Sequence, residues 1–174
     1  MQTVQYEVEG KVIDLVSSTD PILHTTLPEF DFSNPPVDPV QLAKDLAKTM
    51  IHNNGLGLAA NQIGMSYRAF AMATNPVIVC FNPRIVDMSE EKLELEEGCL
   101  SYPGLLLKIV RPRRIKVRYQ YPNGEVVTQV FHDMTARIFQ HELDHLNGVT
   151  FDQYVSSLKL AMARNKMKKR NKFR

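Results

Sequence analysis

The sequence predicts an α+β fold, because short strand-like segments are interrupted by only a few helices and do not alternate regularly with them. One pair of these segments flanks Asn123-Gly124, and this dipeptide between alternating segments is a strong β-hairpin signal. A length of 174 residues suits one domain that buries a core without disulfides or structural metals. The expected strands cover residues 68–73, 77–81, 105–110, 115–120 and 126–131.

The first expected helix follows a proline-rich segment. Residues 28–39 contain four prolines and predict an extended loop, because proline disfavours helix at the residue before it. Asp38 is suited to cap the helix that follows, and Pro39 is suited to its first turn. We expect this helix to end near residues 53–55. Its apolar positions at helical spacing are Ala43, Leu46, Ala47, Met50 and Ile51.

Two further helices are expected in the last third of the chain. One starts at Asp133, a suitable N-cap, and runs through Leu146. Gly148 lies just past its end, where a C-terminal glycine is common. A third helix over roughly residues 156–169 has a thin apolar face, made of Leu160, Ala163 and Met167.

The composition excludes several classes of protein. Apolar residues make up 44% and charged residues 23%, which excludes a fully disordered chain, a collagen-like fibre and a disulfide scaffold. Two cysteines allow at most one bridge, so we expect a reduced, intracellular setting. No apolar run reaches the length of a membrane span. The first ten residues lack a secretory signal and contain Glu7 and Glu9, which transit peptides avoid, so we expect a cytoplasmic protein without membrane contact.

The charge is unevenly distributed along the chain. Residues 159–174 contain eight Lys or Arg and no acidic residue, which leaves 13 basic and 19 acidic residues, a net charge of −6, in residues 1–158. We therefore expect one catalytic domain over residues 1–158 and a basic tail over 159–174 that forms part of a short helix. Such a tail is suited either to contact a polyanion or to lie solvated at the chain end.

The clearest chemical signal is His141-Glu142-Leu143-Asp144-His145. Positions i and i+4 share one face of a helix, so both imidazoles can reach one metal ion. Glu142 lies beside the first histidine, where it can handle the protons of a metal-bound water. The expected helix supplies the context that this chemistry requires.

Two histidines do not complete a catalytic site, which normally has three protein ligands and one open position. The third histidine of metzincin proteases would fall at Phe151, and beyond His145 the only acidic residue is Asp152. The third ligand is therefore sought upstream, and Cys99 is the best candidate. Thiolate and imidazole together suit Fe²⁺, Zn²⁺, Ni²⁺ or Co²⁺. Cys80 fits a buried core position, and His24, His52 and His132 fit structural or exposed positions.

Residues 55–62, Gly-Leu-Gly-Leu-Ala-Ala-Asn-Gln, form a third notable segment. It is not a phosphate-binding loop, because no Gly-Lys-Ser/Thr follows. Its small residues allow another part of the backbone to approach closely. The amide of Gln62 could donate a hydrogen bond to an oxyanion. The alternative is a helix C-cap that leads into a packed turn.

Taken together, the three segments resemble the peptide deformylase family, which is marked by G-x-G-L-A-A-x-Q, E-G-C-L-S and H-E-x-D-H. The chain has these motifs in the same order at residues 55–62, 97–101 and 141–145, and the resemblance covers roughly residues 10–160. It implies an α+β fold with mixed and antiparallel sheets packed around a central metal-bearing helix. It also implies a metal-dependent hydrolase that removes the formyl group from N-terminal formylmethionine of newly made polypeptides and releases formate.

The resemblance implies a role for each motif. Cys99, His141 and His145 would bind one divalent metal, which is commonly Fe²⁺ in this family. Gln62 and the backbone N–H of Leu100 would stabilise the oxyanion. Glu142 would take the proton and deliver it to the leaving amine.

The resemblance also implies how the substrate binds. The peptide would add as a strand near Leu56, Gly57 and Gly98. Met134 and Ile138 are candidate walls of the methionine pocket. Tyr102 stands at the rim of the site, where the family commonly has Ile or Val.

Further expectations concern the supporting residues and the tail. Asp144 would orient a ligand imidazole, and Glu97 would pair with Arg111 to hold the Cys99 loop. The final segment is shorter than the last helix of the bacterial form. We expect the tail to contact the ribosome and to be separable from catalysis, unless Met167 and its neighbours pack on the body.

Two other functions use parts of the same sequence. A zinc endopeptidase shares the His-Glu-x-x-His chemistry but lacks a downstream third ligand here. A nucleic-acid-binding or ribosome-associated module would use the basic tail, but it would give Gln62 and Cys99 no role. It is therefore an addition to the enzyme and not a replacement for it.

Overall fold

The structure is a computed structural model that describes residues 9–172, and it has the expected α+β architecture. Residues 1–8, which include Glu7, and the last two residues of the basic tail lie outside the described residues. No helix within residues 9–172 is long and apolar enough to cross a membrane. The strands are β1 (Gly57–Ala59), β2 (Ala69–Met72), β3 (Ile78–Met88), β4 (Lys92–Cys99), β5 (Tyr102–Pro112), β6 (Arg114–Gln120) and β7 (Val126–His132).

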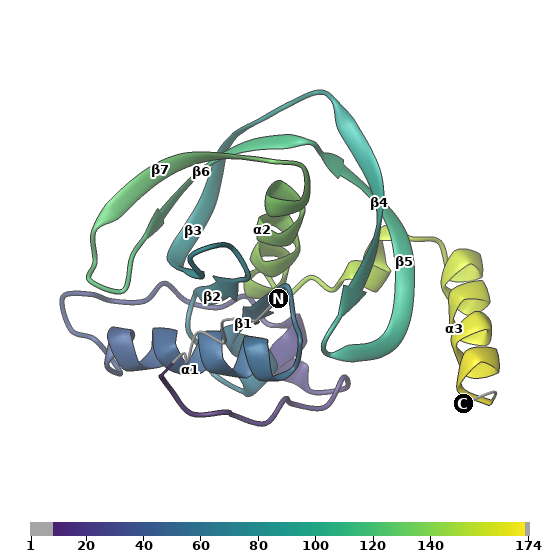
Figure 1. Cartoon of the computed structure of the whole chain (residues 1–174), viewed down its shortest axis with the longest axis horizontal. Helices are drawn as coiled ribbons and strands as arrows, with labels where there is room; N and C mark the ends of the chain where they lie inside the picture. Colours follow the sequence, from purple (N-terminus) through teal and green to yellow (C-terminus); the bar gives the residue numbers. More distant parts are fainter. Residues whose placement is uncertain (1–8, 173–174) are drawn as a thin grey trace, which may run out of the picture.

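The strands form two antiparallel sheets. Five strands pair in the order β1-β2-β3-β6-β7, and β4 pairs only with β5. The predicted hairpin is confirmed, because β6 and β7 pair from Arg114 opposite His132 to Gln120 opposite Val126. Figure 1 shows that both sheets curve around the helix α2 (Asp133–Leu146), which lies near the centre of the molecule. All pairs are antiparallel, so the mixed sheet that the resemblance allowed is absent from the described residues.

Helix α1 (Pro39–His52) begins and ends as predicted. The side chain of Asp38 accepts hydrogen bonds from the backbone N–H groups of Val40 and Gln41, and Asn53 caps the C-terminus. Its inner face packs against β1 and β2. The predicted apolar face is correct except for Ile51, which is exposed.

Helix α2 has the predicted length but not the predicted N-cap. His132 occupies the cap position, while Asp133 is the first helical residue, with φ of 50°, and accepts a hydrogen bond from Arg113 Nε. At the other end Gly148 has φ of 71°, which confirms the predicted C-terminal glycine. The helix packs into the core through Phe139, whose ring packs edge-on against the ring of Phe70 in β2, with the two ring centroids 5.1 Å apart.

The basic segment forms helix α3 (Ser157–Lys172), which lies on the outer side of β5 (Figure 1). The predicted thin apolar face packs against a small cluster, made of Leu105, Leu107, Ile109 and Phe151. Arg170 Nη2 also donates a hydrogen bond to the carbonyl oxygen of Gly104 at 2.7 Å. Met167 and its neighbours therefore do pack on the body. Three short 3-10 helices complete the fold, η1 (Pro21–His24), η2 (Ala60–Ile63) and η3 (Phe151–Tyr154).

The sequence analysis missed two strands and underestimated the lengths of two others, β3 and β5, the second of which spans Tyr102–Pro112 and not only residues 105–110. β4 was not predicted, because Lys and Glu alternate with its two leucines and both charged residues are depleted in strands. β1 spans three residues of the glycine-rich segment, for which a turn was the alternative. β3 continues to Met88, seven residues past the predicted end, through irregular pairing with β6.

Candidate metal centre and active site

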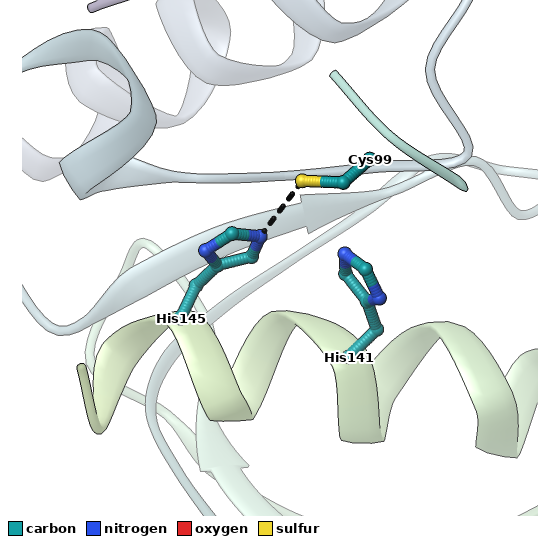
Figure 2. Close-up of side chains that lie close together, drawn as sticks. All are labelled: Cys99, His141 and His145. Atoms are coloured by element: carbon teal, nitrogen blue, oxygen red, sulfur yellow. Dashed lines mark hydrogen bonds between the residues drawn. The ribbon is translucent and has the colours of Figure 1, made fainter. Parts of the chain in front are cut away.

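Helix α2 places His141 and His145 one turn apart on the same face. Both side chains are buried, and their ring centroids are 5.1 Å apart. Cys99 reaches them from the end of β4. Figure 2 shows the three side chains converging, with Cys99 Sγ 3.3 Å from His145 Nε2. One ligand atom from each residue lies within 4.8 Å of the other two, so the group could hold a metal ion.

A tight hairpin brings Cys99 to this position. Cys99 pairs with Tyr102, so Leu100 and Ser101 alone form the turn between β4 and β5. The pairing between β4 and β5 shifts register between Glu97 and Cys99, so the regular strand pairing stops just before the cysteine. The thiol is thus held at the tip of a hairpin and opposite the histidine face of α2.

Glu97 orients the first histidine. Its Oε2 lies 3.0 Å from His141 Nδ1, which directs the other ring nitrogen of His141 toward Cys99. The predicted pairing with Arg111 is confirmed, because Arg111 Nε donates to Glu97 Oε1 at 2.7 Å and Nη2 donates to Oε2 at 3.0 Å. Burial by itself raises the pKa of Glu97, but hydrogen bonds from His141, Arg111 and Arg137 lower this pKa to about 2.

Three supporting residues make contacts that were not expected. Asp144 makes no hydrogen bond to a histidine among the described residues; its Oδ2 accepts a hydrogen bond from Arg111 Nη1 at 2.7 Å. Arg137, which was not predicted, is buried and donates to Glu97 Oε1 at 2.7 Å. Asn61, for which no role was predicted, donates from its Nδ2 to the backbone carbonyl oxygen of His145 at 2.7 Å.

The donor set and its surroundings fit a divalent metal ion. Ligand bonds of about 2.0–2.3 Å in a tetrahedral zinc site put neighbouring ligand atoms roughly 3.3–3.6 Å apart, which is close to the distance between Cys99 and His145. Burial by itself lowers the pKa of His141, but hydrogen bonds to Cys99 and Glu97 raise this pKa to about 10. The pKa of His145 shifts the other way: burial first, and then the charges of His141 and Arg111, lower it well below its usual value, so this ring is held in the neutral form that binds a metal.

Glu142 is buried beside the three donors and has no hydrogen-bond partner for Oε2. Burial raises the pKa of this carboxyl to about 7, and the charge of His141 opposes the rise. A Cβ atom on Gly57 would lie 2.6 Å from Glu142 Cδ, so the carboxylate fits against β1 only because residue 57 is glycine. A carboxyl with this pKa can both accept and donate a proton near neutral pH.

Gln62 faces the hairpin turn from η2. Its Oε1 accepts a hydrogen bond from the backbone N–H of Ala59 at 2.9 Å, which fixes the direction of the amide. Its Nε2 therefore points to the turn, 3.0 Å from Ser101 Oγ and 3.5 Å from Cys99 Sγ. The donor that the sequence suggested thus lies beside the metal donors.

A cavity of about 520 Å³ opens over these groups. The predicted binding residues line it, except Tyr102, whose ring packs against Phe151 with centroids 5.7 Å apart. Cys80 is fully buried in the core, and burial raises the pKa of its thiol. His24, His52 and His132 are exposed, as expected of residues outside the site. The predicted residues that line the cavity are Leu56, Gly57, Gly98, Leu100, Met134 and Ile138.

Known proteins share both the sequence and the fold. The family profile described as Polypeptide deformylase matches residues 12–161. A peptide deformylase from Thermotoga petrophila is 45% identical over 123 residues, which cover 70% of this chain and 75% of that protein.

Two solved structures extend this similarity to the fold. A peptide deformylase from Synechococcus elongatus in complex with actinonin has a TM-score of 0.84 at 30% identity, covering 96% of this chain and 93% of that one. A Met-Ala-Ser bound class I type b peptide deformylase from Acinetobacter baumannii has a TM-score of 0.78 at 33% identity, covering 84% and 100%. The chain therefore belongs to the polypeptide deformylase family, metal-dependent hydrolases that remove the N-formyl group from formylmethionine at the start of newly made polypeptides and release formate.

Proposed function

We propose that this chain carries out deformylation in the cavity above α2, with Cys99, His141 and His145 holding one divalent ion. The observation that supports this best is the convergence of the three donors near Glu142 and Gln62, with Cys99, His141, Glu142 and Gln62 lining one cavity and His145 buried behind it. Each of these groups has a use in amide hydrolysis, and two of their buried polar atoms, Glu142 Oε2 and His145 Nδ1, have no hydrogen-bond partner within residues 9–172, which is uncommon in a core without a functional site.

A bound divalent ion supplies Lewis acidity and lowers the pKa of a water molecule toward 7. Glu142 takes the proton of that water on its carboxylate and delivers it to the leaving amine. Gln62 Nε2 and the backbone N–H of Leu100 donate hydrogen bonds to the formyl oxygen as it gains negative charge. A C–O bond forms at the formyl carbon and its C–N bond breaks, which yields formate and a free amino terminus.

The peptide lies beside β1, an edge strand of the five-stranded sheet. Backbone groups at Leu56, Gly57 and Gly98 border the cavity and can pair with an extended peptide. Met134 and Ile138 line the same cavity and offer apolar contacts to a methionine side chain. The related protein from Acinetobacter baumannii is bound to Met-Ala-Ser, a peptide that deformylation of formyl-Met-Ala-Ser would produce, which supports this assignment.

The ion in the cell is Fe²⁺ in this proposal, although the same donors accept Zn²⁺, Ni²⁺ or Co²⁺. The test is purification without oxygen, followed by elemental analysis and measurement of formate released from formyl-Met-Ala-Ser. Stoichiometric iron with rapid formate release supports the proposal. Cleavage of casein without deformylation would instead identify an endopeptidase.

The basic surface of α3 supports a second component, contact with the ribosome in the cytoplasm, where nascent chains carry the formyl group. Lys and Arg contacts to RNA phosphate weaken steeply as salt increases. Co-sedimentation with ribosomes at low salt that is lost at high salt supports this contact. Co-sedimentation that does not change across a salt series contradicts it.

A further inference from the structure

The three metal donors come from two elements, β4 and α2, that are separated in the chain by the three strands β5, β6 and β7. Cys99 lies at the end of β4, whereas His141 and His145 lie on α2. A metal site requires ligand atoms within a few tenths of an ångström of their bonding positions. Contacts that tie the β4–β5 hairpin to α2 therefore decide how well the site is formed.

Arg137 makes the largest set of such contacts. It lies on α2 one turn before His141, and only 5% of it is exposed. Its Nη1 donates to Glu97 Oε1 at 2.7 Å and to the carbonyl oxygen of Ile109 at 2.8 Å, and its Nη2 donates to the carbonyl oxygen of Leu93. One guanidinium thus binds the backbone of both strands and the carboxylate that orients His141.

The geometry requires the planar donor fork of arginine. Three acceptors lie in different directions around one head group, and a lysine ammonium at the end of a flexible chain does not match them all at once. Removing the guanidinium would leave the carbonyls of Leu93 and Ile109 without this donor and would remove one cation from the buried Glu97 carboxylate. Arg111 does not replace it, because its remaining hydrogen bond goes to Asp144.

We propose that Arg137 is a positioning residue that fixes Cys99 relative to the two histidines, by bracing the hairpin against α2 and holding Glu97 on His141. This inference rests on the proposed metal site. Outer residues that orient metal ligands typically change metal affinity or activity by about 10–100-fold when they are replaced. Arg137 makes no hydrogen bond to any of the three donors in the described structure, so the proposed effect passes through Glu97 and the two strands.

The test compares Arg137→Met and Arg137→Lys with the unchanged chain. Zinc affinity is measured by competition with a chelator, and the visible spectrum of the Co²⁺-loaded protein reports the ligand geometry. We expect Arg137→Met to bind zinc about 10–100-fold more weakly, with a changed Co²⁺ spectrum, and Arg137→Lys to recover part of the affinity. The matched control is Arg113→Gln, because Arg113 also links the hairpin region to α2, through Glu91 and Asp133, but is half exposed and distant from the donors.

A general loss of stability is separated from positioning by two further measurements. Circular dichroism and thermal unfolding of the zinc-loaded proteins show which variants fold. If Arg137→Met does not fold, the zinc affinity and Co²⁺ spectrum of Arg137→Lys are compared with those of the unchanged chain. If Arg137 acts through Glu97, the zinc affinity of the Arg137→Met and Glu97→Gln double variant falls by less than the product of the single effects.

The proposal is overturned if a folded Arg137→Met protein binds zinc within about twofold of the unchanged chain and gives the same Co²⁺ spectrum. Additive effects in the double variant would exclude the route through Glu97. Failure of the unchanged chain to bind zinc would contradict the proposed metal site itself, so the two failures are distinguishable.

Discussion

Replacing Gly57 with alanine should displace the Glu142 carboxylate without touching a metal donor. A Cβ atom at residue 57 would lie 2.6 Å from Glu142 Cδ and 2.7 Å from Cγ, whereas ordinary contacts begin at 3.4 Å. The carboxylate would therefore have to move by at least about 0.8 Å, because Glu142 Oε1 would lie closer still to the new Cβ atom. The backbone of residue 57 is not in the left-handed region, so alanine is free of backbone strain there. The steric effect on Glu142 is thus the main consequence.

The expected magnitude follows from this displacement. A misplacement of about 1 Å in a catalytic arrangement can reduce the rate by about 100-fold. A decrease of that size corresponds to about 2.7 kcal/mol in the activation free energy. We expect kcat for formyl-Met-Ala-Ser to fall by about this factor while zinc content, measured by elemental analysis, stays at one ion per chain.

Two companion variants make the test specific. Gly124→Ala, in the β6–β7 turn where φ is 83°, should lower the unfolding temperature but leave kcat unchanged. Glu142→Asp withdraws the carboxylate by one methylene group, so it should cost less activity in the Gly57→Ala background than in the unchanged chain. If zinc-loaded Gly57→Ala keeps kcat within about threefold, the position of Glu142 does not control the reaction and the reasoning is refuted.

Three other outcomes are expected. Cys99→Ala should lose tight metal binding and turnover, whereas Cys80→Ser should keep the metal and lower stability; full metal occupancy in Cys99→Ala would contradict the ligand assignment. Glu142→Ala should keep the metal and lose about 100-fold or more in kcat, and metal loss without a separate catalytic defect would exclude its role as acid and base. Truncation after Leu160 removes Ala163 and Met167, which pack on the same apolar cluster as Cys99, so it should lower the unfolding temperature and also kcat for a short formyl peptide, and it should weaken ribosome co-sedimentation at low salt; unchanged co-sedimentation would show that the tail only packs on the body and does not contact the ribosome.

Local signals predicted the elements that local chemistry determines. Asp38 caps α1 and Gly148 follows α2, because caps depend on residues within one turn of the helix end. The β6–β7 hairpin is specified by its turn and by alternation in both strands. The histidine pair is also local, since helical periodicity by itself puts His141 and His145 on one face.

The surroundings of the site could not be predicted in the same way, because they depend on contacts distant in sequence. β4 has only two half-buried leucines, so its pairing with β5 is determined by the hairpin and not by its own residues. Asp144 accepts a hydrogen bond from Arg111 of β5 and none from a histidine among the described residues. This pairing depends on how the β4–β5 hairpin lies against α2. Arg137 belongs to none of the three motifs. Only the structure shows that it donates hydrogen bonds to Glu97 and to two backbone carbonyl groups.

The three motifs pack against one another, and the glycines of the first motif leave room for side chains of the other two. Gly57 leaves the space that Glu142 of the third motif occupies. Gly55 does the same for the second motif, since a Cβ atom there would lie 2.7 Å from Leu100 Cδ1. Gln62, at the end of the first motif, donates to Ser101 at the end of the second. A change at either glycine therefore acts on a side chain more than 40 positions away in the sequence, so the motifs have to be considered together when one of them is altered.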